Sequence, residues 1–218
     1  MKLRWILTLA GLVWTLAATA PASALEAVGL TVGVDRTKMS GDEPPNFRLQ
    51  QGTGFKVGAI VEFTLADDVR LSLQPGYQRT ATKLGFKDKA TGDVRDSLDL
   101  DVDWINVPVI LRIETSHSLF ATGGLDLAFL TGGGITGGGS DVPAESFLKD
   151  VDLAAIFGVG VAFPVGRYEL TGELRYRQGL VNLARENLGE RLATVPPRFR
   201  FAGFQLQVGL TLPWGGRR

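Results

Sequence analysis

Three aspartates form the clearest group of residues whose types and spacing could do chemistry. Asp99, Asp101 and Asp103 alternate along the chain, so in a β-strand their carboxylates would share one face. Calcium prefers such oxygen ligands, but the spacing and the glycine of an EF-hand calcium loop are missing. Basic residues on neighbouring strands could pair with the same carboxylates. We expect this pairing, with cation binding as the alternative, and we assign no metal site.

Two further motifs match reactive or ligand-binding sites only in part. The run 132–137 has the G-x-G-x-x-G spacing of a dinucleotide site, which also requires a helix directly after it. More glycine follows instead, so we expect a flexible surface loop. Ser116-His117-Ser118 is predicted to form a tight turn, in which no third group orients the histidine for nucleophilic catalysis. We therefore predict no catalytic residue, no cofactor and no enzymatic activity.

The composition excludes several other classes of function. The 23 basic and 23 acidic residues cancel, so the 218-residue chain lacks the positive charge of a nucleic-acid-binding protein. It has no cysteine, which excludes disulfides, thiol nucleophiles and thiolate metal sites.

Residues 1–24 have the organisation of a secretory signal peptide. Lys2 and Arg4 precede an apolar run from Trp5 to Ala20, and Ala22-Ser23-Ala24 offers a small-residue cleavage site. An uncleaved anchor is the alternative, but the run is shorter than the roughly 20 residues that a transmembrane helix needs. We predict export of the protein and a mature domain of residues 25–218.

The mature chain alternates between apolar and polar residues with a period of two, which is typical of β-strands. The pattern predicts eight strands, near residues 25–35, 53–64, 69–79, 98–113, 119–130, 151–163, 167–179 and 201–212. The connections are long and short in turn, and the long loops cover 36–52, 80–97, 131–150 and 180–200. This arrangement predicts an all-β fold, an eight-stranded antiparallel up-and-down transmembrane β-barrel with short periplasmic turns and long extracellular loops.

The two faces of the predicted strands differ in a way that indicates which one meets lipid. On every strand but the fourth, one face is apolar and without charge, as lipid contact requires. The other face is small and mostly uncharged, which suits a narrow lumen. Aromatic residues of the apolar face are predicted to form two belts at the membrane interfaces. These are Phe55, Tyr77, Trp104, Phe129 and Tyr176 at the long-loop rim, and Phe63, Phe163, Tyr168 and Trp214 at the other. A soluble lipocalin-like barrel, with its apolar face inside, is the alternative.

Charged residues on the lumen face carry both signs. They are Lys56, Arg70, Arg175 and Arg177, with Glu62, Asp126, Asp152, Glu169 and Glu173. Because buried charges need partners, we expect ion pairs to fill the lumen rather than an open pore. The strand near 98–113 changes its apolar parity, and a β-bulge near Trp104–Pro108 is expected to absorb the change.

Several motifs resemble those of the PorT-like outer-membrane β-barrel proteins, in the same order along the mature chain. They are Leu73-Gln74-Pro75-Gly76-Tyr77, Trp104-Ile105-Asn106-Val107-Pro108-Val109-Ile110-Leu111-Arg112, Glu173-Leu174-Arg175-Tyr176 and Gly179-Leu180-Val181-Asn182-Leu183. Two features depart from the family pattern. Asn106 replaces the usual acidic residue, and the chain ends four residues after Trp214 instead of on an aromatic residue.

The resemblance implies a β-barrel in the lipid bilayer of the cell outer membrane of a Gram-negative envelope. The family's name-giving member is tied to protein secretion, so a link to secretion or surface contact is implied as well. We expect a non-enzymatic, monomeric protein with a structural or interaction role and no nucleic-acid partner. A small-ligand carrier or a narrow transport channel is the alternative function.

The predicted orientation can be tested by labelling, because the chain has no native cysteine. A cysteine introduced as Ser140→Cys should react with an impermeant maleimide on intact cells, and Gly166→Cys should not, since long loops lie outside and short turns in the periplasm. Labelling of the second variant alone would invert the topology.

Overall fold

The computed structural model describes residues 25–41, 47–87, 94–116, 118–136, 142–185 and 198–214. The predicted signal peptide, residues 1–24, and His117 lie outside the described residues. In the described part of the chain, no helix has both the length and the hydropathy that a membrane crossing requires.

The fold consists almost entirely of β-strands. They are β1 (Leu25–Gly41), β2 (Phe47–Ala66), β3 (Val69–Leu73), β4 (Gly76–Lys87), β5 (Val94–Ser116), β6 (Leu119–Thr136), β7 (Val142–Pro143), β8 (Val151–Val165), β9 (Tyr168–Gly179) and β10 (Phe199–Pro213). Within the described residues, one 3-10 turn, η1 (Ala144–Ser146), follows β7.

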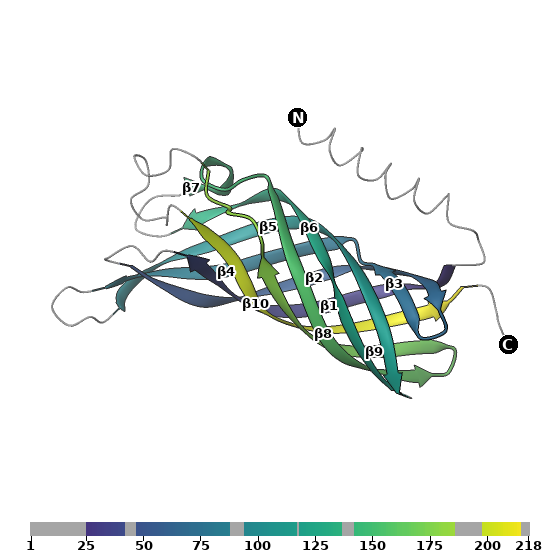
Figure 1. The fold of residues 1–218 in the computed structure, drawn as a ribbon. Coiled ribbons are helices and arrows are strands. Elements are labelled where there is room, and N and C mark those ends of the chain that lie inside the picture. Colours follow the sequence, from purple (N-terminus) through teal and green to yellow (C-terminus); the bar gives the residue numbers. More distant parts are fainter. Residues whose placement is uncertain are drawn as a thin grey trace.

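The strands close into one antiparallel ring (Figure 1). Most strands pair with the next strand in sequence, but β3 and β4 each pair with both β2 and β5, and β6 pairs with β8. β1 pairs with both β2 and β10, which closes the barrel. Because β3 and β4 occupy one position in the ring and β7 lies beside the end of β6, the ring has the eight strands that the sequence predicts.

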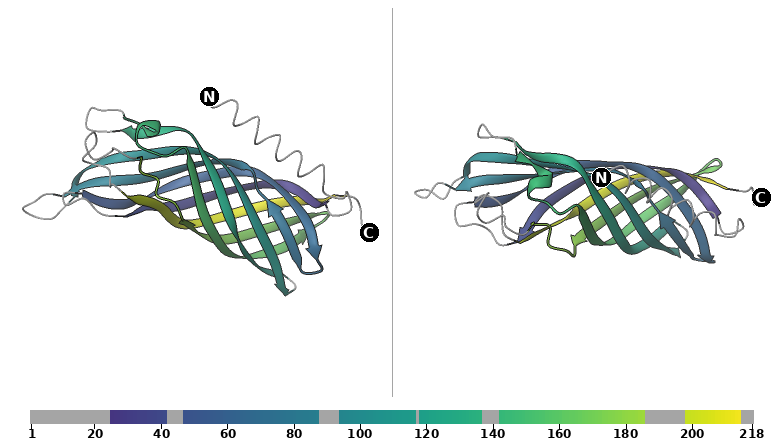
Figure 2. Two further views of the ribbon diagram at one scale, coloured as in Figure 1. Left: turned by 45° about the horizontal axis from the view of Figure 1, so that its top comes forward. Right: turned by 90° about the horizontal axis from the view of Figure 1, so that it is seen from above.

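The two ends of the barrel differ. At one end, called the turn end here, β2–β3, β5–β6 and β8–β9 are joined by short turns, and β1 begins where β10 ends. At the other, the hairpin end, β1–β2 and β4–β5 continue as long hairpins that project beyond the barrel (Figure 2). The predicted loops 36–52 and 80–97 are therefore too long. Strand β1 is paired as far as Gly41, and β4 and β5 are paired as far as Lys87 opposite Val94.

The glycine-rich run at 132–137 is also ordered differently from the prediction. Gly132, Gly133 and Gly134 belong to β6 rather than to a surface loop. Gly133 has a φ of 106°, a conformation that favours glycine, and a Cβ there would lie 2.2 Å from the Asp101 carbonyl oxygen. Glycine thus allows β6 to pass close to β5 at this point.

The apolar residues of β5 shift from even to odd positions near Trp104, and this shift is not caused by a bulge in β5 as predicted. Alternation along β5 is unbroken, and Trp104 points inward and is buried, so its assignment to the outer aromatic belt is wrong. The extra residue is Thr131 of β6, since Asp103 pairs with Gly132 and Trp104 with Leu130. Apolar residues fill the lumen at this level, and they produce the change in sequence pattern.

Pro108 is accommodated by an interruption in the neighbouring strand. β3 and β4 are separated at Gln74–Pro75, next to Pro108. The Gln74 amide donates to the Pro108 carbonyl at 3.0 Å, and the Ala59 amide donates to the Pro75 carbonyl at 2.9 Å. The barrel remains closed here although each proline lacks an N–H donor.

The outer surface of the barrel is apolar, as predicted for contact with lipid. Exposed residues on the outer face include Leu30, Val32, Val34, Phe157, Val159, Leu206 and Val208. Toward the hairpin end the rings of Phe55 and Tyr77 lie 5.8 Å apart, and those of Tyr176 and Phe204 lie 5.1 Å apart. Phe163 and Trp214 are exposed toward the turn end, whereas Phe63 is buried.

The close approach at Gly133 predicts that Gly133→Ala destabilises the barrel by roughly 1–3 kcal/mol, because the added Cβ meets backbone and the φ is unfavourable. Gly132→Ala is the matched control, since the nearest atom to its Cβ is 3.6 Å away. Urea unfolding in detergent micelles measures both. Equal midpoints for the two variants would contradict the prediction.

Candidate functional site

The three alternating aspartates face outward at the hairpin end, above the apolar part of β5. Lys83 Nζ lies 3.4 Å from Asp99, and the Arg79 guanidinium donates to Asp101 at 2.7 Å. The Tyr77 hydroxyl donates to Asp103 at 2.5 Å. The predicted pairing with basic neighbours is therefore present for two of the three carboxylates. Within the described residues, no group of three or more His, Asp or Glu side chains is placed to hold a metal ion.

The other two motifs do not form sites in the part of the chain that the structure describes. The glycines of 132–134 lie in a strand, and β7 and a 3-10 turn, not an α-helix, are the next described elements. Ser118 lies in the turn between β5 and β6, as predicted, while His117 is outside the described residues. Among the residues described around the glycine run, none begins a helix that could receive a dinucleotide phosphate.

The lumen is where charged side chains converge. Its middle level, toward the hairpin end, is organised by Arg177 of β9. The guanidinium donates to Asp126 of β6 at 3.0 Å and to Asp152 of β8 at 2.7 Å. Asn106 of β5 donates to Asp126 at 3.2 Å and to Gln78 of β4 at 3.3 Å. These contacts connect the strands on opposite sides of the lumen.

A second arginine crosses the lumen one step closer to the turn end. Arg175 is the largest fully buried side chain among the described residues, and it donates to both oxygens of Glu173, at 2.6 and 2.7 Å. It also donates to the Gln74 side chain from the other wall, at 2.8 Å. Thr122 donates to Glu173 at 2.6 Å. Short charge-assisted bonds of this kind are among the stronger hydrogen bonds in proteins.

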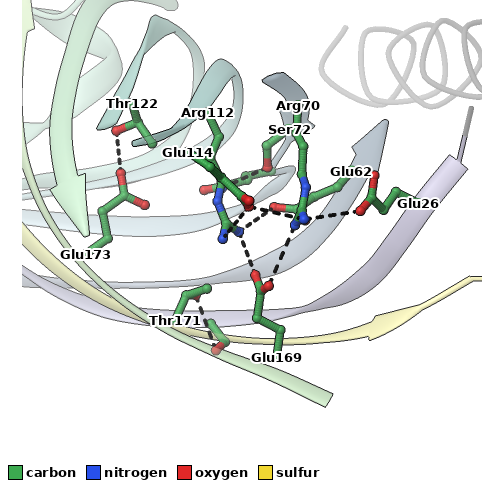
Figure 3. A network of polar contacts seen from close by, with 12 residues as sticks. Glu26, Glu62, Arg70, Ser72, Arg112, Glu114, Thr122, Glu169, Thr171 and Glu173 are labelled. Atoms are coloured by element: carbon green, nitrogen blue, oxygen red, sulfur yellow. Dashed lines mark hydrogen bonds and ion pairs between the residues drawn. The ribbon is translucent and has the colours of Figure 1, made fainter. Parts of the chain in front are cut away.

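At the turn end of the lumen, Arg70 and Arg112 lie among the carboxylates of Glu26, Glu62, Glu114 and Glu169 (Figure 3). Arg112 contacts Glu62, Glu114 and Glu169, the last at 2.7 Å. Arg70 contacts the same three carboxylates and Glu26, at 3.1 to 3.7 Å. The guanidinium of Arg112 also lies 4.2 Å from the centre of the Phe120 ring. Each arginine is shared among several acids, so the cluster acts as one network rather than as separate pairs.

Some buried polar atoms of the lumen have no protein partner. They include Lys56 Nζ, Asp35 Oδ1, Asn106 Oδ1 and Asp152 Oδ1. Because an unpaired buried polar group is costly, ordered water would have to satisfy them. Two further buried atoms without a hydrogen bond, Glu62 Oε2 and Arg112 Nε, belong to residues that line a cavity of about 20 Å³ shared with Gln74 and Arg175, which has room for one water molecule but not for a solute.

The hairpin end of the lumen is closed by apolar residues. Trp104, Leu100 and Val102 of β5 pack there with Phe199 and Phe201 of β10. Segments outside the ring complete the cluster, which also contains Phe147, Leu148, Leu183 and Ala184. The barrel is therefore plugged by ion pairs in the middle and at the turn end, and by an apolar cap at the hairpin end.

The sequence identifies most of this network but not all of it. All nine predicted lumen charges face the interior, although Lys56 has no ion pair. Arg112, Asn106 and the apolar cap were not predicted, because the pattern of the strand around Trp104 does not show which of its faces is inside. The even-numbered residues from Leu98 to Arg112 all point inward, and reading one unbroken alternation over this stretch would have assigned Asn106, Arg112 and Trp104 to the lumen.

Comparison with known proteins places this architecture among outer-membrane barrels. The family described as outer membrane protein beta-barrel domain matches residues 23–185. No curated protein matches the sequence significantly.

Similar solved structures have low sequence identity. Neisserial surface protein A has 14% identity and a TM-score of 0.47, covering 86% of this chain and 99% of its own. Ail of Yersinia pestis has 11% identity and a TM-score of 0.41, covering 87% and 99%. The outer membrane protease OmpT of Escherichia coli has 6% identity and a TM-score of 0.37, covering 88% and 97%.

The lumen network predicts that Arg177→Met destabilises the barrel by about 3–5 kcal/mol, because it leaves Asp126 and Asp152 buried without a cation. Arg185→Met is the matched control. It breaks a 2.6 Å pair with Asp150 whose side chains are 42% and 74% exposed, and a 2.6 Å hydrogen bond from the Arg185 side chain to the Leu148 carbonyl, so we expect a loss of about 1–2 kcal/mol. Urea unfolding gives the loss of unfolding free energy for both variants. A similar loss in the two would contradict the prediction that the buried ion pairs contribute more to stability than an exposed pair.

Proposed function

Since this chain belongs to the family of outer membrane protein beta-barrel domains, we propose that it is a closed, non-enzymatic barrel with a structural or interaction role. The protein lies in the cell outer membrane. One observation carries the proposal: among the described residues, ion pairs occupy the middle and the turn end of the lumen and an apolar cap closes its hairpin end, and the cavity between Glu62, Gln74, Arg112 and Arg175 has a volume of only about 20 Å³. A channel or a carrier would need a continuous path or a ligand-sized space.

The surfaces left for an interaction are the hairpin end and the turn end. The β1–β2 and β4–β5 hairpins extend beyond the ring and present their outer faces, with the hairpin end proposed to lie outside the cell. We propose that these hairpins contact other envelope or surface components and that the barrel works as a monomer. Residues 1–24 are proposed to be removed during export.

A more specific assignment, to the PorT-like proteins, is part of this proposal. Its support is the set of motifs around Gln74–Pro75 and Asn106–Pro108, which meet where β3 and β4 are interrupted beside β5. In this structure the family's acidic position is held by Asn106, which donates to Asp126. A link to secretion rests on the resemblance alone.

The alternatives are a small-ligand carrier and a narrow channel. A lipocalin-like carrier needs an apolar interior and a polar outer surface, whereas here Arg175 and Arg177 lie inside and Leu30 and Val159 are exposed outside. A narrow channel would have to pass the shared contacts of Arg70 and Arg112 and then the cap around Trp104.

Single-channel recording in planar bilayers tests the closed state. We expect no stable conductance steps from the folded protein, because the network and the cap together leave no continuous aqueous path. A general porin reconstituted in the same way shows that the bilayers can report a channel, and heat-modifiable gel mobility shows that the sample is folded. A reproducible conductance would contradict the proposal and favour the channel.

A further inference from the structure

The outer face of β10 and β1 carries a group of cations at the hairpin end. Arg36 and Lys38 project from β1, Arg200 projects from β10, and Arg198 directly precedes β10. All four are exposed. None of them has an ion pair or a side-chain hydrogen bond to a described residue. We call these four residues the basic patch.

The register of the two strands brings these cations close together. Lys38 is opposite Ala202 and Ser40 is opposite Arg200, so Lys38 and Arg200 are diagonal neighbours on the outer face. Arg36 is opposite Phe204. Like charges at neighbouring positions of a sheet destabilise it, so their presence calls for an anion that offsets the repulsion.

The other outward-facing charges at this end are organised differently. On β4 and β5, Arg79 pairs with Asp101 and Lys83 pairs with Asp99 across the strands. Among the described residues, the outward-facing cations of β4 and β5 are thus neutralised by aspartates, whereas those of the basic patch have no acidic partner. This contrast indicates that the basic patch is complementary to a negative charge supplied from outside the described chain.

The position of the patch identifies the source of that charge. Val32 and Val34 are outward residues of β1 that are more than half exposed, and Arg36 is the next outward residue, about 7 Å further along the strand. Phe204, opposite Arg36, forms a tilted ring pair with Tyr176, and aromatic residues of this kind are typical of the membrane interface. The cations therefore begin where the lipid-facing surface ends, which is the level of lipid headgroups.

We propose that the basic patch binds the phosphate groups of anionic lipids in the leaflet that surrounds the hairpin end. Arginine suits this role because its guanidinium forms paired hydrogen bonds with phosphate oxygens. The proposal rests on the outer-membrane location of the barrel and not on the proposed interaction role or on the closed lumen. A failure of either of those would therefore not contradict it.

Spin-labelled lipids test the proposal in reconstituted vesicles of phosphatidylcholine. We expect spin-labelled phosphatidylglycerol to associate with the folded protein about fivefold more strongly than spin-labelled phosphatidylcholine, on the order of the effect of one basic residue near an anionic surface. The quadruple variant Arg36→Gln, Lys38→Gln, Arg198→Gln and Arg200→Gln should lose this preference.

Two further variants serve as controls. Replacing the three arginines by Lys keeps the charge and should keep most of the preference. Lys149→Gln with Arg167→Gln removes exposed cations elsewhere and should leave the preference unchanged. Heat-modifiable mobility checks that every variant is folded.

Two results would overturn the proposal. In one, phosphatidylglycerol is preferred equally by the protein and by the quadruple variant. In the other, the unmodified protein in phosphatidylcholine vesicles binds heparin and the quadruple variant does not, while both have the same lipid preference. The basic patch would then be a site for a soluble polyanion instead.

Discussion

Closure of the hydrogen-bonded ring is the constraint on which the rest of this structure depends. Once β1 pairs with β10, each of the eight strand positions of the ring has a partner on both sides, and no edge remains in the part of the barrel wall that the structure describes. Half of the side chains must then enter a lumen only eight strands in circumference. Charges that enter it lose water on all sides, so Arg112, Arg175 and Arg177 are each bonded to carboxylates on other strands or on their own. The plug is a consequence of closure.

The same constraint explains why the lumen is closed by two kinds of interaction. Ion pairs fix the middle and the turn end, where the ring is complete and its neighbouring strands supply acids and bases at matching heights. Toward the hairpin end the strands separate into hairpins, and a polar network there would be open to water. Apolar side chains such as Trp104 and Phe201 take over at this level, together with Phe147 and Leu183 from outside the ring.

Most of the fold could be predicted from the sequence because a two-residue period is a direct consequence of strand geometry. Strand number, pairing order and the lumen charges follow from it. The prediction failed where another interaction overrides the pattern. Trp104 was assigned to the lipid-facing surface because the apolar residues that fill this part of the lumen have the same sequence pattern as an outer face. The bulge was placed in β5, whereas the extra residue is Thr131 of β6. Gly132–Gly134 resembled a loop because composition does not reveal that β6 needs glycine to approach Asp101.

The apolar cap has a consequence for how the hairpin end can recognise anything. Phe147 and Leu148 follow the 3-10 turn, and their fully buried side chains hold that segment on the barrel. The Lys149 amide donates to the Leu183 carbonyl, and the Arg185 amide donates to the Phe147 carbonyl. The described segments 142–150 and 180–185 are thereby tied to each other and to the ring. A surface held in this way loses little conformational entropy on binding, so its contacts contribute more fully to affinity than those of free loops. The interior plug and the exterior surface are therefore parts of one arrangement, in which filling the lumen also fixes what the barrel presents.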